Sequence, residues 1–153
     1  MGLYYEDFHV GDEWETPGRT VTETDVVEFA QLSGDFNPLH TDRVFAAGTP
    51  FGQPIAHGLL ALSMATGLMA RLGIFDGTVL AFLSPEQWDF KRPIFFGDTI
   101  KVHLQIESMR TTRDGLRGIL RRRVSVVNQR NEIVQDGILT TMVRRKEDAP
   151  HDA

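Results

Sequence analysis

The sequence contains no cysteine among its 153 residues. This absence excludes disulfide bonds, cysteine-ligated metal centres and thiol nucleophiles together. Residues 1–7 also lack the basic region and following apolar run that are typical of a signal peptide. Both absences favour a reducing, cytoplasmic environment.

Positive charge is also in short supply, with 16 Lys and Arg against 21 Asp and Glu, for a formal net charge of −5. This balance argues against nucleic acid as the main partner. The longest apolar stretch, residues 55–73, is interrupted by Ser63, Thr66 and Gly67, whereas a membrane span needs about 20 apolar residues. We therefore expect neither a nucleic acid nor a membrane as partner.

The length and the apolar content of 41% favour one globular domain with a sizeable core. The sequence shows no internal repeat and no linker. We therefore predict a single domain over residues 1–153, with its core in residues 5–144 and a polar, frayed tail at 145–153.

The first half of the chain carries signals for short strands followed by helices. Residues 13–16 and 19–21 are predicted to be extended. The sequence Thr22-Glu23-Thr24-Asp25 resembles a capping box, which predicts a helix that ends at Gly34. A short helix is expected over residues 41–47.

Residues 55–73 predict a helix that is apolar on almost every side, and such a helix must be buried. The second half alternates apolar and polar residues, as in an antiparallel sheet. The predicted fold is therefore α+β, with a sheet wrapped around a long central helix. A free sheet edge would need cover, and we expect edge-to-edge homodimerisation to provide it. The strands are expected at 78–83, 87–91, 99–108, 115–128 and 132–144.

The stretch from Ser33 to His40 holds a carboxylate and an imidazole, at Asp35 and His40, around a turn. Pro38 restricts the residue before it, so a regular helix is not expected here. A fixed acid and base on a shaped loop is the arrangement that proton transfer requires. Spacing alone favours the simpler interpretation of an Asx-turn with a surface histidine.

The five histidines raise the question of a metal, but none shows the His-x-x-x-His or Glu-x-x-His spacing of a helical metal site. The glycines at 48 and 52 lack the lysine of a phosphate-binding loop. We expect no metal and no separate cofactor.

The run from Phe29 to His40, with Ser-Gly-Asp-Phe-Asn-Pro-Leu-His at its end, resembles the signature of the MaoC-like, (R)-specific enoyl-CoA hydratases. The resemblance extends over residues 5–144, including Pro-Ile-Ala-His-Gly at 54–58 and Lys-Arg-Pro at 91–93. It implies a hotdog fold and a hydro-lyase of fatty acid metabolism. The implied substrate is a trans-2-enoyl-CoA, with coenzyme A present only as part of that substrate.

The resemblance also implies roles for individual residues. Asp35 and His40 would together hold one water beside C3 of the enoyl thioester, and neither would be a nucleophile or a metal ligand. Gly58 would offer its backbone N–H to the thioester oxygen, where the N-terminus of the predicted helix already favours negative charge. The assignment of acid and base within the pair stays open.

Further substrate contacts are expected from five residues, each with a simpler alternative. Thr66 could instead bond back to a helix carbonyl, and Trp88 could be plain core. Arg92 could bind the phosphates of coenzyme A or belong to a solvated edge, as could Arg43, Lys91 and Arg121–Arg123. His57 is interpreted as a core or interface histidine. The five predicted substrate-binding residues are Phe36, Asn37, Thr66, Trp88 and Arg92.

Two other functions compete with hydration. A hotdog thioesterase shares the fold and the thioester substrate, although thioesterases lack the Asn-Pro-x-His run. A non-catalytic subunit that binds acyl thioesters would not need Asp35 and His40, and both are present.

Overall fold

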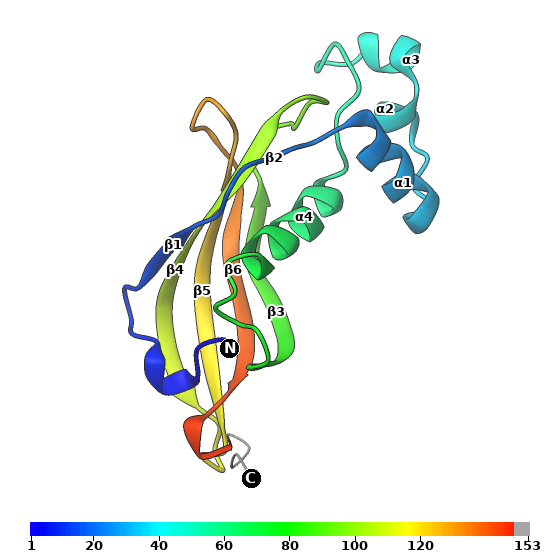
Figure 1. The fold of residues 1–153 in the computed structure, drawn as a ribbon. Helices are drawn as coiled ribbons and strands as arrows, with labels where there is room; N and C mark the ends of the chain where they lie inside the picture. Colours follow the sequence, from blue (N-terminus) through cyan, green and yellow to red (C-terminus); the bar gives the residue numbers. More distant parts are fainter. Residues whose placement is uncertain (149–153) are drawn as a thin grey trace.

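The computed structural model describes residues 1–148, in which a long helix lies against one face of an antiparallel sheet (Figure 1). The central helix and the strands after it supply most of the core. In chain order the elements are η1 (Tyr5–Asp7), β1 (Glu13–Glu15), β2 (Arg19–Thr20), α1 (Glu23–Ser33), α2 (Pro38–Thr41), α3 (Arg43–Ala47), α4 (Gly58–Ala70), β3 (Val79–Phe90), β4 (Thr99–Thr111), β5 (Arg117–Val127), β6 (Ile133–Arg144) and η2 (Lys146–Asp148).

The sheet has the strand order β1-β4-β5-β6-β3, with β2 pairing to the start of β4. The two strands predicted at 78–83 and 87–91 are one strand, β3, whose pairing with β6 shifts register three times. Pro85 lies within it, which a strand at the sheet edge tolerates because one side needs no ladder partner. Strand β3 is therefore the free edge that the sequence led us to expect.

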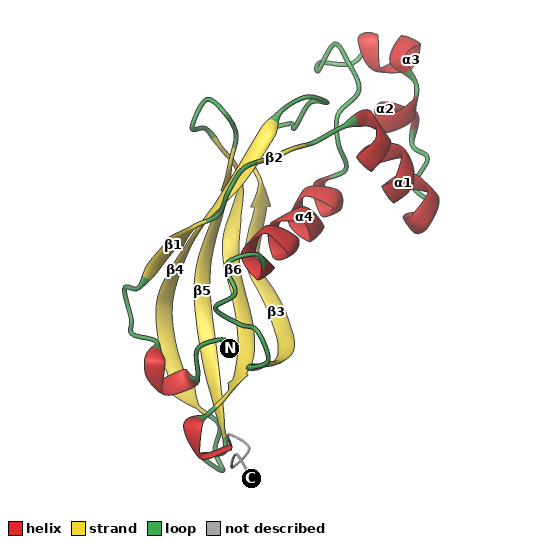
Figure 2. Ribbon diagram, in the orientation of Figure 1, coloured by secondary structure: helices red, strands yellow, loops and turns green. Residues whose placement is uncertain are grey.

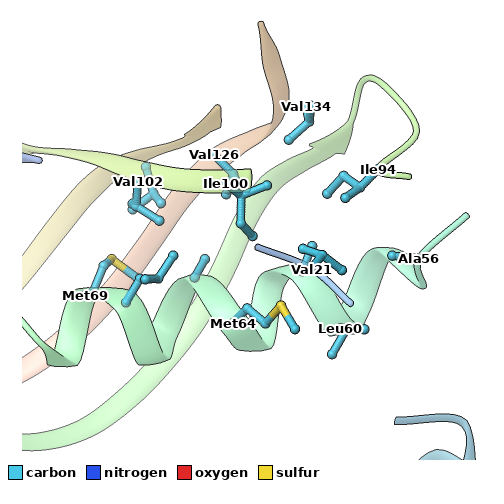
Figure 3. Packing of buried hydrophobic residues seen from close by; sticks show 14 of the residues in the cluster. Val21, Ala56, Leu60, Met64, Met69, Ile94, Ile100, Val102, Val126 and Val134 are labelled. Carbon is cyan, nitrogen blue, oxygen red and sulfur yellow. The ribbon is translucent and has the colours of Figure 1, made fainter. Parts of the chain in front are cut away.

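Helix α4 packs its buried side chains onto the sheet (Figure 3), where Leu60, Met64 and Met69 join the cluster that contains Ile100 and Val102. The prediction that this helix is buried on every side is wrong for one stripe. One sheet covers only one side of the helix within a single chain. The exposed positions of α4 recur at helical spacing: Leu59, Ser63, Thr66, Gly67 and Ala70.

Helices α1, α2 and α3 project beyond the sheet near the start of α4 (Figure 2). The Thr22 side chain and Asp25 form the predicted capping box, and α1 ends at Gly34, whose φ of 77° is left-handed. The expectation of a non-helical segment up to His40 is wrong in part. Residues 38–41 form one helical turn, because Pro38 occupies its first position, where its missing N–H costs nothing.

The start of the predicted tail is ordered against the N-terminal segment. Arg145 pairs with Glu6 at 2.7 Å, and the backbone N–H of Lys146 donates to the same carboxylate at 2.9 Å. Residues 145–148 are thus not frayed, and the rest of the predicted tail, 149–153, lies outside the described residues. Within residues 1–148 no helix is long and apolar enough to cross a membrane.

Candidate active site

Asp35 lies in the loop between α1 and α2, held by two short-range turns. Its Oδ1 accepts a hydrogen bond from the N–H of Asn37 at 3.1 Å, and the Asn37 Oδ1 accepts one from Leu39 at 2.9 Å. The Asx-turn predicted from spacing is therefore present. The turn uses only one carboxylate oxygen of Asp35, and the other, Oδ2, takes no part in it. The Asp35 side chain is 53% exposed. The turn and a role in proton transfer are compatible.

His40 lies on α2, and its ring is anchored at Nδ1, which is 2.7 Å from the carbonyl oxygen of Ile55. A carbonyl oxygen only accepts, so Nδ1 carries the proton and donates it. In the neutral ring Nε2 then keeps its lone pair, so this imidazole can accept a proton there.

His57, the residue that precedes α4, joins this pair. Its Nε2 lies 2.9 Å from the backbone carbonyl oxygen of Asp35 and 3.9 Å from the carboxylate Oδ2. Its ring stacks on His40 with centroids 3.8 Å apart and planes 28° apart. One polar atom from each of the three side chains lies within 4.8 Å of the other two. Sequence spacing could not reveal this cluster, because its members come from separate elements.

The cluster resembles a set of metal ligands in its composition but not in its hydrogen bonding. The His57 Nε2, the ring nitrogen that lies 3.9 Å from the Asp35 carboxylate, donates to a backbone carbonyl, whereas a metal ligand must offer a lone pair. The absence of a metal stays a prediction.

Gly58 begins α4 and lines a pocket of about 460 Å³. No described side chain caps this end of the helix, so its first N–H groups remain available to a ligand. A Cβ built on Gly58 would come within 2.6 Å of the Phe90 ring, so glycine is what lets that ring approach. The pocket is lined by His40, Phe51, Ile55, Ala56, Gly58, Leu59, Phe90, Lys91, Arg92, Pro93, Ile94 and Gln135.

Gln135 is a buried amide behind Gly58 that the sequence did not single out. Its Nε2 donates to the Gly58 carbonyl at 3.0 Å, and its Oε1 accepts from Trp88 Nε1 at 3.2 Å. It ties the start of α4 to strands β6 and β3. Strand alternation gives the face of such a residue but not its partner, so no sequence signal identified it.

Some of the predicted site residues line this pocket and others do not. His40, Gly58 and Arg92 line it, and Asp35 lies beside the pocket-lining His40 in the cluster with His57. The Thr66 hydroxyl donates back to the Ser63 carbonyl at 2.7 Å, which is the alternative anticipated for it. The other predicted substrate contacts do not line the pocket: Phe36 is exposed, Asn37 caps α2 and Trp88 lies behind Gln135.

Comparison with known proteins finds a matching family and several similar proteins. The family described as MaoC like domain matches residues 7–128. The chain is 32% identical to 3-hydroxybutyryl-CoA dehydratase of Methylorubrum extorquens over 147 residues, covering 96% of this chain and 88% of that protein. It is 40% identical to (R)-specific enoyl-CoA hydratase of Aeromonas caviae over 56% of this chain and 62% of that protein.

A third relative, Protein MaoC of Klebsiella aerogenes, is 42% identical over 66% of this chain, which spans only 30% of that longer protein. Among solved structures, a monoamine oxidase regulatory protein of Archaeoglobus fulgius has a TM-score of 0.89 at 37% identity, with 95% of this chain and 96% of that one covered. A double hotdog protein of Mycobacterium tuberculosis has a TM-score of 0.82 at 22% identity, covering 99% of this chain and 47% of that one. The predicted hotdog fold is confirmed.

Proposed function

The chain belongs to the MaoC-like domain family, and from that premise we propose that it is a hydro-lyase interconverting a trans-2-enoyl-CoA and an (R)-3-hydroxyacyl-CoA. Relatives named as an (R)-specific enoyl-CoA hydratase and a 3-hydroxybutyryl-CoA dehydratase support the reaction class. The observation that carries the proposal is the shared pocket. A proton acceptor, His40, and an uncapped helix N-terminus, at Gly58, open onto the same space.

A carboxylate oxygen of Asp35 and a ring nitrogen of His40 lie within 4.8 Å of each other, and Nε2 is the nitrogen of that ring whose lone pair is free. One water can donate a hydrogen bond to each, because two bonds of ordinary length span that separation. Both of its protons are then engaged, and an oxygen lone pair remains to attack C3 of the substrate. Hydroxide adds to C3, one proton passes to the pair, and the pair returns one proton to C2. The protonation of the pair is therefore unchanged after one turnover.

Negative charge develops on the thioester oxygen as C3 is attacked. The first N–H groups of α4, at Gly58 and after it, lack intrahelical partners and lie at the positive end of the helix dipole. In an apolar pocket such donors stabilise an enolate-like oxygen, and one of them is typically worth about 10²–10³-fold in rate. Gln135 holds the Gly58 peptide from behind.

The function is tested by incubating the protein with crotonyl-CoA and following the loss of its conjugated enoyl absorbance. Hydration is expected to produce the (R)-3-hydroxy product, identified by chiral chromatography. Release of free CoA thiol would instead favour the thioesterase alternative. Binding without turnover, over a panel of short, branched and medium enoyl-CoAs, would favour the non-catalytic one.

The contact between Gly58 and Phe90 yields a prediction about the oxyanion donor. A Gly58→Ala substitution pushes its methyl group into the Phe90 ring and is expected to lower kcat by about tenfold, because small misplacements of catalytic groups are costly. The double variant with Phe90→Ala removes the clash and is expected to recover at least half of that loss. Steady-state kinetics with crotonyl-CoA measures both. Equal kcat in the single and double variants would contradict the steric argument.

We place the phosphates of coenzyme A near Arg92, at the pocket mouth. Lys91 is paired with Asp136 at 2.9 Å, whereas the carboxylate that Arg92 interacts with, Glu132, is hydrogen-bonded to Asn128 and Arg130 instead. Arg92→Ala is expected to raise KM for crotonyl-CoA about 3- to 10-fold and to leave KM for crotonyl-pantetheine, which lacks the adenosine phosphates, within twofold. Lys91→Ala is the matched control. A similar rise with both substrates would show that Arg92 does not contact the phosphates.

Homodimerisation remains part of the proposal. The free edge strand β3 exposes apolar side chains, among them Phe82 and Leu83 at 52% and 44%. An uncovered apolar edge is open to pairing with a second copy. Sedimentation equilibrium is expected to give twice the chain mass, and Phe82→Glu is expected to shift it toward the monomer. A wild-type monomer at micromolar concentration would contradict it.

A further inference from the structure

His57 is the described side chain that contacts both members of the proposed catalytic pair. From this geometry, and resting on the proposed function, we infer that His57 is a positioning residue that keeps Asp35 and His40 in a fixed position relative to each other. It does this through a hydrogen bond on one side and a stacked ring on the other. Its own protons take no part in the reaction.

The hydrogen bond from His57 is the bond of Asp35 itself that reaches the body of the protein. The other bonds of Asp35 are local: its N–H donates to Ser33 Oγ at 3.2 Å, and its Oδ1 accepts from Asn37. The segment after the turn is also tied to the backbone of Ile55, but those bonds do not involve Asp35. The bond from His57 Nε2 to the Asp35 carbonyl crosses 22 positions of sequence and joins the loop to the start of α4. Without it the carboxylate would keep its turn but lose its direct link to α4.

The stacked ring orients His40. The edge of the His40 ring is held by the carbonyl of Ile55, and its face by His57 at 3.8 Å. Both anchors lie within three residues of each other in the segment leading into α4. Rotation of the His40 imidazole would break both, so Nε2 stays directed toward the site. Phe29 packs against His57 with ring centroids 5.0 Å apart and supports this stack.

The chemistry of His57 itself excludes a role as the base. Its Nε2 proton is donated to a carbonyl oxygen, which accepts the hydrogen bond but has no proton to give in return. Its Nδ1 is buried and has no hydrogen-bond partner among residues 1–148. Protonation there would bury a donor with no acceptor, which is costly. His57, 3% exposed, therefore serves as a donor at Nε2 with its ring held in one orientation.

Two substitutions separate the hydrogen bond from the bulk of the ring. His57→Phe keeps a flat ring that can stack on His40 but loses the donor to Asp35. It is expected to lower kcat for crotonyl-CoA hydration about 10- to 100-fold, with KM changed by less than about threefold. His57→Gln restores an N–H donor of similar reach and is expected to recover at least threefold over the Phe variant. Phe29→Leu trims a ring that contacts His57 at a tilt of 58° but keeps the hydrogen bond to Asp35 and the ring stacked on His40. It is therefore the matched packing control and is expected to keep kcat within about threefold.

The positioning role would be overturned if kcat fell equally in the His57→Phe and His57→Gln variants. It would also be overturned if the loss of kcat followed the fall in Tm and matched that of Phe29→Leu. An inert wild type would instead overturn the proposed function, so the two failures are distinct.

A second readout is independent of turnover. Long-range ¹H–¹⁵N spectra of the histidine rings at neutral pH are expected to show His57 as the Nε2–H tautomer and His40 as the Nδ1–H tautomer. In His57→Gln, which removes the ring stacked on His40, the His40 signals are expected to shift toward tautomer averaging. A His57 that is charged or Nδ1-protonated, or a His40 signal unchanged by His57→Gln, would refute the inference.

Discussion

Asp35→Asn and His40→Ala are each expected to lower kcat for crotonyl-CoA hydration by about 10²–10⁴-fold, the usual contribution of a positioned proton-transfer group. The Asn side chain cannot accept the water's proton as a carboxylate does. The Ala side chain removes the Nε2 lone pair that His40 offers to the pocket. Steady-state kinetics on purified variants, with far-UV circular dichroism as a check on folding, measures this effect.

Both substitutions are expected to leave the fold intact. An Asn at position 35 can still accept the N–H of Asn37 through its Oδ1, and the Asp35 side chain is half exposed. His40→Ala loses the bond to Ile55, which costs about 1 kcal/mol. His103→Ala is the control, because His103 is an exposed histidine paired with Glu15 on the sheet.

The Asp35→Asn, His40→Ala double variant shows whether the two residues act together on one water or contribute to catalysis independently. If Asp35 and His40 hold the same water, removing the second costs little once the first is gone, as for catalytic groups that act together. The double variant is expected to lie within about threefold of the slower single variant. Multiplication of the two single losses would mean that the residues act on different atoms.

Local sequence signals predicted the elements that local physics determines. Thr22 and Asp25 cap α1, and Gly34 ends it in the left-handed conformation that glycine adopts freely. The alternating strands after residue 99 form as predicted. The signals failed where burial depends on the whole molecule. An apolar helix sequence does not reveal that only one sheet covers it, so the exposed stripe of α4 was missed.

The same distinction applies to the site. The Asp35–His40 spacing and the resemblance identified the pair, because both residues lie in one short segment. His57 was interpreted only as a core or interface histidine and Gln135 was not singled out, since each acts on a group brought near by tertiary packing, 22 and 77 positions away in sequence. Their signal is a polar side chain in an apolar context, which has too many possible partners to assign without coordinates.

Three consecutive arginines on β5 have different surroundings. Strand alternation directs Arg121 and Arg123 to one face, where they pair with Glu86 and Glu107. A solvated edge is the wrong interpretation for Arg122, which is 5% exposed. Its guanidinium donates to the Leu139 carbonyl at 3.3 Å and to the Thr141 hydroxyl, and stacks over Phe75 at 4.9 Å.

No described carboxylate forms an ion pair with this buried cation, and its burial lowers the pKa of Arg122 from 12.5 to about 10. A depression of that size corresponds to about 3 kcal/mol of lost folding free energy at neutral pH. The hydrogen bonds from the charged guanidinium to Leu139 and Thr141 offset this loss, at about 1.5 kcal/mol each. Because the two effects nearly cancel, an apolar side chain of similar volume, which buries no charge, is expected to be favoured.

Arg122→Met is therefore expected to raise the free energy of unfolding at pH 7 by about 1–2 kcal/mol, because methionine fills similar space and packs well against the Phe75 ring. Urea denaturation measures the difference. Arg123→Met is the control, since it removes an exposed ion pair worth about 1 kcal/mol or less. A loss of more than about 2 kcal/mol in Arg122→Met would mean that the contacts of the guanidinium outweigh the cost of burying it.

The pH dependence supplies an independent check on this cost. Below pH 10 Arg122 is charged in both the folded and the unfolded chain, so the difference between wild type and Arg122→Met is expected to be constant. Above about pH 10 the folded wild type releases its proton before the unfolded chain does, so its stability relative to the variant rises with pH. Urea denaturation at pH 7, 9 and 11 is expected to show an equal difference in unfolding free energy between wild type and variant at the first two values and a smaller one at the third. A difference that stays constant or grows at pH 11 would mean that burial does not depress the pKa of Arg122, and the stabilisation by methionine would need another cause.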